Sequence, residues 1–269
     1  MLPRDTLFAA VMIICNGVIG ICVLVGALRH REQSCRAEGA TSALAALIAM
    51  STLSLVLPVF TTSSPGATYT RAQLAFAAFA SLGLWSLYVF MQTVRHRDYF
   101  LPENPAALDV DTHAVPPTRR LAWLSFCMLV ASLVAVVGLA KILSPTIEAA
   151  VSAVGAPKAV VGIAIALLVL LPETGAALRA ASANRLQTSM NLALGSAMAS
   201  IGLTIPAVAA ASILLDLPLV LGLDPKDLVL LTLTYAVATI TLVSGRTHLM
   251  LGAVHLSIFA AFLFLALVP

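Results

Sequence analysis

Long apolar runs separated by short polar stretches dominate this chain. Each run is about 20 residues long, the length of α-helix that crosses a hydrocarbon core about 30 Å thick. The runs are continuously apolar, whereas the strands of a membrane barrel alternate apolar and polar residues. The pattern predicts an all-α polytopic membrane protein with about eight spanning helices, at residues 5–28, 40–60, 72–94, 121–141, 158–184, 187–214, 226–244 and 248–267.

The composition agrees with a membrane protein and excludes an ordinary soluble domain. The 269 residues are 60% hydrophobic and 10% charged, whereas soluble domains average about 25% charged residues. The net charge of +3 gives no indication of a nucleic-acid partner, so the expected partner is the lipid bilayer. The cysteines show no CxxC spacing and are interpreted as packed or free thiols, at Cys15, Cys22, Cys35 and Cys127.

The basic residues are unevenly divided between the two ends of the predicted helices. Ten of the fifteen fall on one side, which predicts that this side is cytoplasmic and that the N-terminus lies outside, in a bacterial cytoplasmic (inner) membrane. These ten are Arg29, Arg31, Arg36, Arg95, Arg97, Arg119, Arg120, Arg179, Arg185 and Arg246. The connection 95–120 would then be a cytoplasmic linker, whose acids either are solvated or bind a regulatory cation.

Glu173 is the one carboxylate deep inside a predicted span, because Asp5 and Asp227 stand at the ends of theirs. A charge at bilayer depth costs about 2.5–3.5 kcal/mol on insertion scales, and ion or proton handling is the usual function that offsets such a cost. Pro172 precedes it and Gly175 follows, which predicts a broken helix whose free carbonyls could coordinate a cation. The alternative is a protonated Glu173 hydrogen-bonded to a neighbouring helix.

The next span carries small and polar residues on two faces. One face holds Ser189, Ser196 and Ser200, and the nearly opposite face holds Asn191, Gly195 and Gly202. Amide and hydroxyl oxygens suit a hard cation, while small residues favour close helix packing. Packing is the interpretation for the glycines, and both interpretations stay open for Asn191 and the serines. Pro206 is expected to break or kink this helix as well.

A short repeat links this span with the first one. Asn16-Gly-Val-Ile-Gly20 and Asn191-Leu-Ala-Leu-Gly195 share the pattern Asn-x-x-x-Gly, in spans of opposite predicted direction. An inverted repeat predicts such pairs. His255, inside the last span, is interpreted as a hydrogen-bonded histidine in preference to a proton relay.

Signatures of nucleotide-driven pumps and membrane proteases are absent from the sequence, including HExxH, GxSxG and P-loop patterns. The chain is therefore expected to be no enzyme and to need no cofactor. A non-transporting scaffold, and an intramembrane enzyme using Glu173 and His255, are the competing hypotheses.

At these residues the chain resembles the second alpha-repeat of calcium/cation antiporters, most closely the bacterial sodium–calcium/proton type. The resemblance lies in Leu171-Pro172-Glu173, in residues 179–188 and in residues 191–206, with Thr174 and Asn191 replacing the wider family's His and Asp. It implies secondary transport of calcium, sodium or potassium against protons by alternating access. The candidate ion- and proton-binding residues are Glu173, Thr174, Asn191, Ser196, Ser200 and Asn16, with Glu173 as the metal ligand.

The family fold implies ten core helices in two inverted five-helix repeats, each supplying one acid. Residues 1–94 would then be a partial first repeat of three helices, and residues 121–269 a complete second repeat. Apart from Asp5, at the very start of the first span, the three spans before residue 95 contain no Asp or Glu. Calcium takes six to eight oxygens, usually with several carboxylates, so the chain as written is expected to bind calcium weakly and to be impaired in exchange.

Overall fold

The computed structural model describes residues 2–101, 118–153, 155, 157 and 159–268. Within them, seven helical stretches are long and apolar enough to cross a membrane. They are Pro3–His30, Ala37–Phe60, Arg71–Arg95, Val160–Ser182, Leu186–Leu215, Pro225–Val243 and Leu249–Leu267. Each coincides with a predicted span, so the all-α polytopic fold is confirmed.

Three of the spans change their helical winding along their length. The first consists of α1 (Leu2–Met12), the π-helical η1 (Ile13–Val18) and α2 (Ile19–His30). The second consists of α3 (Ala37–Ser51), the π-helical η2 (Thr52–Val56) and α4 (Leu57–Phe60). The third consists of α5 (Arg71–Phe90) and the π-helical η3 (Met91–Arg95), and the short 3₁₀ helix η4 (Arg97–Phe100) follows.

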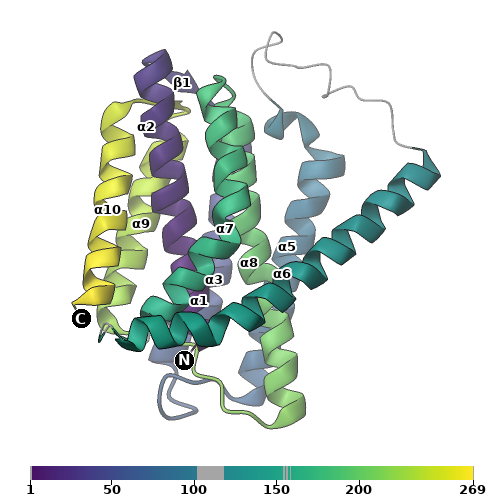
Figure 1. Cartoon of the computed structure of the whole chain (residues 1–269), viewed down its shortest axis with the longest axis vertical. Helices are drawn as coiled ribbons and strands as arrows, with labels where there is room; N and C mark the ends of the chain where they lie inside the picture. The colour runs from purple at the N-terminus through teal and green to yellow at the C-terminus, as the bar shows by residue number, and fades with distance from the viewer. Residues whose placement is uncertain (1, 102–117, 154, 156, 158, 269) are drawn as a thin grey trace.

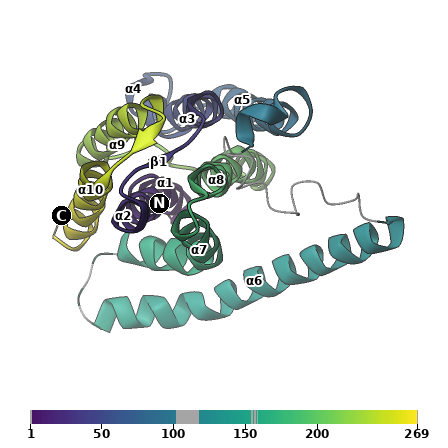
Figure 2. The same ribbon diagram turned by 90° about the horizontal axis from the view of Figure 1, so that it is seen from above.

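The later elements are continuous helices. They are α6 (Arg119–Ala153), α7 (Ala159–Ser182), α8 (Leu186–Leu215), α9 (Pro225–Val243) and α10 (Leu249–Leu267). Helix α6 is much longer than the predicted span 121–141 and is not among the seven spans above. It continues through Pro145 without interruption. Figures 1 and 2 show α6 lying obliquely outside the bundle.

The first span forms the centre of the bundle. Its most apolar window is 78% buried, and α7, α8, α9 and α10 surround it in the view of Figure 2. At one end, β1 (Gln33–Ser34) pairs antiparallel with β2 (Arg246–Thr247). This end also holds residues 29–36 and 179–185, and it is called the arginine-rich end below. The end where α1 and α9 begin is called the N-terminal end.

The predicted break at Pro172 is wrong, and the helix is not broken at Pro206 either. Helix α7 continues through Pro172 and Gly175, and α8 continues through Pro206. Membrane helices tolerate proline when neighbouring groups satisfy the freed backbone atoms. The irregular backbone lies instead in the first three spans, in η1 around Asn16 and in η2 and η3.

Candidate functional site

Glu173 lies well inside the membrane-spanning part of α7. It stands 14 residues after Ala159 and 9 before Ser182, about 21 Å and 14 Å at 1.5 Å per residue. Its side chain is partly buried, and its Oε2 atom is buried without a hydrogen-bond partner in the part of the chain that the structure describes. A buried carboxylate oxygen without a donor is available to a cation or a proton.

A groove of about 330 Å³ lies between α1, α7 and α8, and its lining on α7 ends at Leu170, about one turn before Glu173. Thr6, Ser200 and Thr204 contribute hydroxyl groups to its lining, and Leu170 contributes an apolar wall. Glu173 follows Leu170 by three residues and therefore shares its helix face. The groove thus brings one predicted site residue, Ser200, near the face of α7 that carries the acid.

The opposite face of α8 packs against α5. A Cβ atom added at Gly202 would lie 2.6 Å from the Cβ atom of Trp85, so only glycine permits this approach. Gly195 lies beside the Tyr88 hydroxyl, which a Cβ atom there would approach to 3.8 Å. The packing interpretation of Gly202 is therefore confirmed.

Asn191 is occupied by protein partners. Its Nδ2 atom donates to the Phe100 carbonyl at 2.6 Å, and its Oδ1 atom accepts from Gln187 at 3.0 Å. The structure therefore does not bring the Asn191 amide together with Glu173. The sequence pattern missed this arrangement because Phe100 lies 91 residues earlier in the chain.

Asn16 belongs to a second buried polar cluster, built from η1, α9 and α10. Its Nδ2 atom donates to Thr234 at 2.8 Å, and its Oδ1 atom lies 3.1 Å from Nδ1 of His255. The other ring nitrogen of His255 lies 3.0 Å from the Thr241 hydroxyl. All four side chains are fully buried or nearly so. In the sequence, this cluster is indicated only by the seven-residue spacing of Thr234 and Thr241, which places both on one face of α9.

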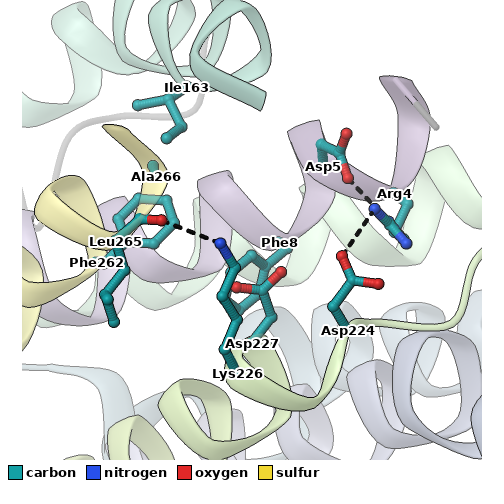
Figure 3. A pocket seen from close by; sticks show the side chains of 10 residues that line it. All are labelled: Arg4, Asp5, Phe8, Ile163, Asp224, Lys226, Asp227, Phe262, Leu265 and Ala266. Atoms are coloured by element: carbon teal, nitrogen blue, oxygen red, sulfur yellow. Dashed lines mark hydrogen bonds and ion pairs between the residues drawn. The ribbon is translucent and has the colours of Figure 1, made fainter. Parts of the chain in front are cut away.

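Charged residues that the sequence analysis did not single out line a small cavity of about 70 Å³ at the N-terminal end (Figure 3). Arg4 donates to Asp5 at 2.8 Å, to Asp224 at 3.4 Å and to the Gly222 carbonyl at 3.1 Å. Lys226 donates to the Leu265 carbonyl at 3.0 Å, at the end of α10. This network joins the beginnings of α1 and α9 to the end of α10.

The candidate site around Glu173 has few negatively charged ligands. Among the described residues, no group of three or more His, Cys, Asp or Glu side chains could hold a metal ion. One carboxylate and nearby hydroxyls can hold a proton or a weakly bound cation, but they lack the several carboxylates typical of calcium sites.

Comparison with known proteins identifies the family. The model of the sodium/calcium exchanger protein family matches residues 2–94 and 124–268. The chain belongs to this family. Members of this exchanger family are transporters, so membership supports a transporter in preference to an enzyme.

Two curated relatives match almost the whole chain. "Putative ionic transporter y4hA" of Sinorhizobium fredii (strain NBRC 101917 / NGR234) is 50% identical over 266 residues, covering 99% of this chain and 72% of the relative. "Sodium-potassium/proton antiporter ChaA" of Escherichia coli (strain K12) is 30% identical over 264 residues, covering 97% of this chain and 71% of the relative.

Two solved structures share the fold. Native YfkE has a TM-score of 0.74 at 18% identity, and the match covers 100% of this chain and 75% of that one. The H⁺/Ca²⁺ exchanger CAX has a TM-score of 0.71 at 17% identity, covering 97% of this chain and 64% of that one. The family model and the 30% identical relative place the chain in the calcium/cation antiporter superfamily, a class of membrane transporters, and the two solved structures show the same fold.

Proposed function

We propose that this chain forms the ion-binding part of a cation/proton antiporter, with Glu173 as the group that takes up either a cation or a proton. The buried, unpartnered Oε2 atom of Glu173 in α7 is the observation that carries the proposal. The names of two similar proteins, a sodium-potassium/proton antiporter and an H⁺/Ca²⁺ exchanger, support this chemistry.

The mechanism follows from the two charge states of one carboxyl group. Ionised Glu173 attracts a cation, which Ser196, Ser200 and Thr174 would help to coordinate through their hydroxyl oxygens. Protonation removes the charge and releases the cation. Because both ligands compete for one group, alternating exposure of that group to the two sides of the membrane couples their movements in opposite directions.

The division of the chain into repeats belongs to the same proposal. Residues 1–94 would be three helices of a first repeat, residues 95–120 a cytoplasmic linker and residues 121–269 a second repeat of five helices. The end of α2 and the start of α8 both lie at the arginine-rich end, so the helices that carry Asn16 and Asn191 run in opposite directions. The excess of arginine supports a cytoplasmic location for this end, in an inner membrane with the N-terminus outside.

Reconstituted vesicles provide the test. The chain is placed in liposomes with a trapped pH dye and an acidic interior, and proton release is followed after adding Na⁺, K⁺ or Ca²⁺ outside. A second form fuses the chain to the segment of y4hA that lies outside the matched region. We expect cation-dependent proton release that is at least ten times faster in the fused form.

The decisive variant is Glu173→Gln, which keeps the shape of the side chain and removes its charge. We expect it to abolish exchange in the fused form, whereas Glu148→Gln, a change of an exposed acid on α6, retains it. Full exchange by Glu173→Gln overturns the assignment of the site. Equal rates for the two forms overturn the partial repeat, and no cation-dependent proton movement in either form overturns the antiport proposal.

A further inference from the structure

A four-residue segment closes over the arginine-rich end of the bundle. This segment is η4, Arg97–Phe100, and it is called the plug segment below. Arg97, Asp98 and Tyr99 are exposed, but Phe100 is only 7% exposed and is inserted among α3, α5 and α8. Its ring packs edge-on against Tyr88 of α5, with the ring centroids 5.8 Å apart. One aromatic side chain therefore anchors the segment.

A closed set of hydrogen bonds holds the main chain of the plug segment. Asn191 donates to the Phe100 carbonyl at 2.6 Å, and the guanidinium of Arg36 donates to the Asp98 carbonyl at 2.8 Å. Gln187 joins the two donors, because it donates to Asn191 at 3.0 Å and accepts from the Arg36 main-chain N–H at 2.6 Å. The contacts thus connect the α2–α3 loop, α8 and the plug segment.

The surface of α3 is shaped for this contact. A Cβ atom added at Gly39 would lie 2.5 Å from the Tyr99 carbonyl oxygen, which is closer than non-bonded atoms approach. Glycine at the start of α3 therefore permits the main chain of the plug segment to lie directly on the helix.

One buried polar group beside the plug segment has no partner. The Tyr88 hydroxyl is buried beside Gly195 and has no hydrogen-bond partner among the described residues. A buried hydroxyl without a partner is unfavourable, and withdrawal of Phe100 would relieve this by admitting water. Several contacts therefore stabilise the bound plug segment, and the unpaired Tyr88 hydroxyl disfavours it. A segment that binds reversibly needs such a balance between two states.

We propose that the plug segment reversibly closes the arginine-rich end of the transporter, with Phe100 as its anchor and Asn191 as the residue that holds it. The closing role rests on the proposed antiport function, whereas the binding of the segment does not. Phe100 contacts Tyr88, Tyr88 reaches Gly195, and the next residue is the candidate ligand Ser196. The plug segment therefore acts on the candidate site through α8, because it contacts the side of this helix opposite Ser196 and Ser200.

Hydrogen exchange followed by mass spectrometry tests the binding without any transport. In detergent micelles, the peptide containing residues 97–101 should exchange slowly in the parent chain. Asn191→Leu keeps the side-chain size and removes the hydrogen bonds, and Gly39→Ala displaces the segment without altering Asn191. Each should accelerate exchange in this peptide at least tenfold and leave peptides of α1, α9 and α10 unchanged. The matched control Leu192→Ala, at an exposed neighbouring position of α8, should have no effect.

Equal exchange of the peptide in parent, Asn191→Leu and Gly39→Ala proteins overturns the binding. The closing role is tested in the fused, vesicle-reconstituted form, where Asn191→Leu and Phe100→Ala should each change the rate of cation uptake from the arginine-rich side at least threefold. If the variants accelerate hydrogen exchange of the peptide but leave the rate of cation uptake unchanged, the closing role is overturned and the binding stands. A parent form without antiport overturns the proposed function and with it the closing role, whereas the exchange result for binding still stands.

Discussion

The Nδ1 atom of His255 on α10 lies 3.1 Å from the side-chain oxygen of Asn16 in the π-helical segment of the first span. The Asn16 amide donates its N–H to Thr234 at 2.8 Å, so its oxygen faces the ring and requires a proton on Nδ1. His255 is thereby a fixed link between η1 and α10, and Thr241 occupies its second nitrogen at 3.0 Å.

Two substitutions separate the roles of the two ring nitrogens. In His255→Asn the amide nitrogen replaces Nδ1, and in His255→Gln it replaces Nε2. We expect His255→Asn to keep the Asn16 contact and to be more stable than His255→Gln by about 1 kcal/mol, because the latter leaves the buried Asn16 oxygen unpaired. Thermal unfolding of the purified variants in one detergent measures the difference. Equal stabilities would show that the Asn16 contact contributes nothing.

The apolar pattern was sufficient to predict the class of fold, but not the local irregularities. Span positions depend on hydrophobic length, which is readable directly from the chain. Asn16, inside the π-helical segment, bonds to partners in α9 and α10 that lie more than 200 residues away, so no local pattern announces this arrangement. The expected break at Pro172 did not occur because proline in a membrane helix is accommodated by its surroundings.

The sequence indicated one residue of the candidate site and misjudged another. Glu173 stands out in sequence because an acid inside an apolar run is rare. Asn191 is a good cation ligand by chemistry alone, but its amide is bonded to a carbonyl 91 residues earlier. Long-range contacts of this kind carry no local signal, so the residue type suggested a role that its hydrogen bonds do not support.

Glu173→Gln should not destabilise the protein. The Oε2 atom is buried without a donor, so the substitution removes a charge that burial disfavours and replaces it with a neutral amide. We expect an unfolding midpoint equal to or above that of the parent, together with the loss of cation binding. Thr174→Val serves as a control, since loss of its bond to the Leu170 carbonyl should cost about 1 kcal/mol. A large destabilisation by Glu173→Gln would indicate a structural role for the carboxylate.

Helix α8 offers a matched pair of glycines for testing its contact with α5. An added Cβ atom at Gly202 would lie 2.6 Å from Trp85, whereas at Gly195 the nearest contact would be an ordinary 3.8 Å. Gly202→Ala should therefore cost about 1–3 kcal/mol through overpacking. Gly195→Ala should be neutral or stabilising by up to about 1 kcal/mol, because alanine favours helix. Chemical unfolding in mixed micelles distinguishes the two, and equal effects would contradict the observed approach of Trp85.

Arg4 should contribute more to stability than an exposed arginine that makes an equally short ion pair. Arg4 is 8% exposed and contacts Asp5, Asp224 and the Gly222 carbonyl, whereas Arg71 pairs with Asp216 where both side chains are largely exposed. Arg4→Met leaves two acids and a carbonyl without their donor, and we expect a loss of about 1–2 kcal/mol. Arg71→Met should change stability by less than about 1 kcal/mol, because water screens exposed pairs. Thermal unfolding at low and high salt compares them. A shift for Arg4→Met no larger than that for Arg71→Met would mean that the network in Figure 3 does not hold α1 against the start of α9.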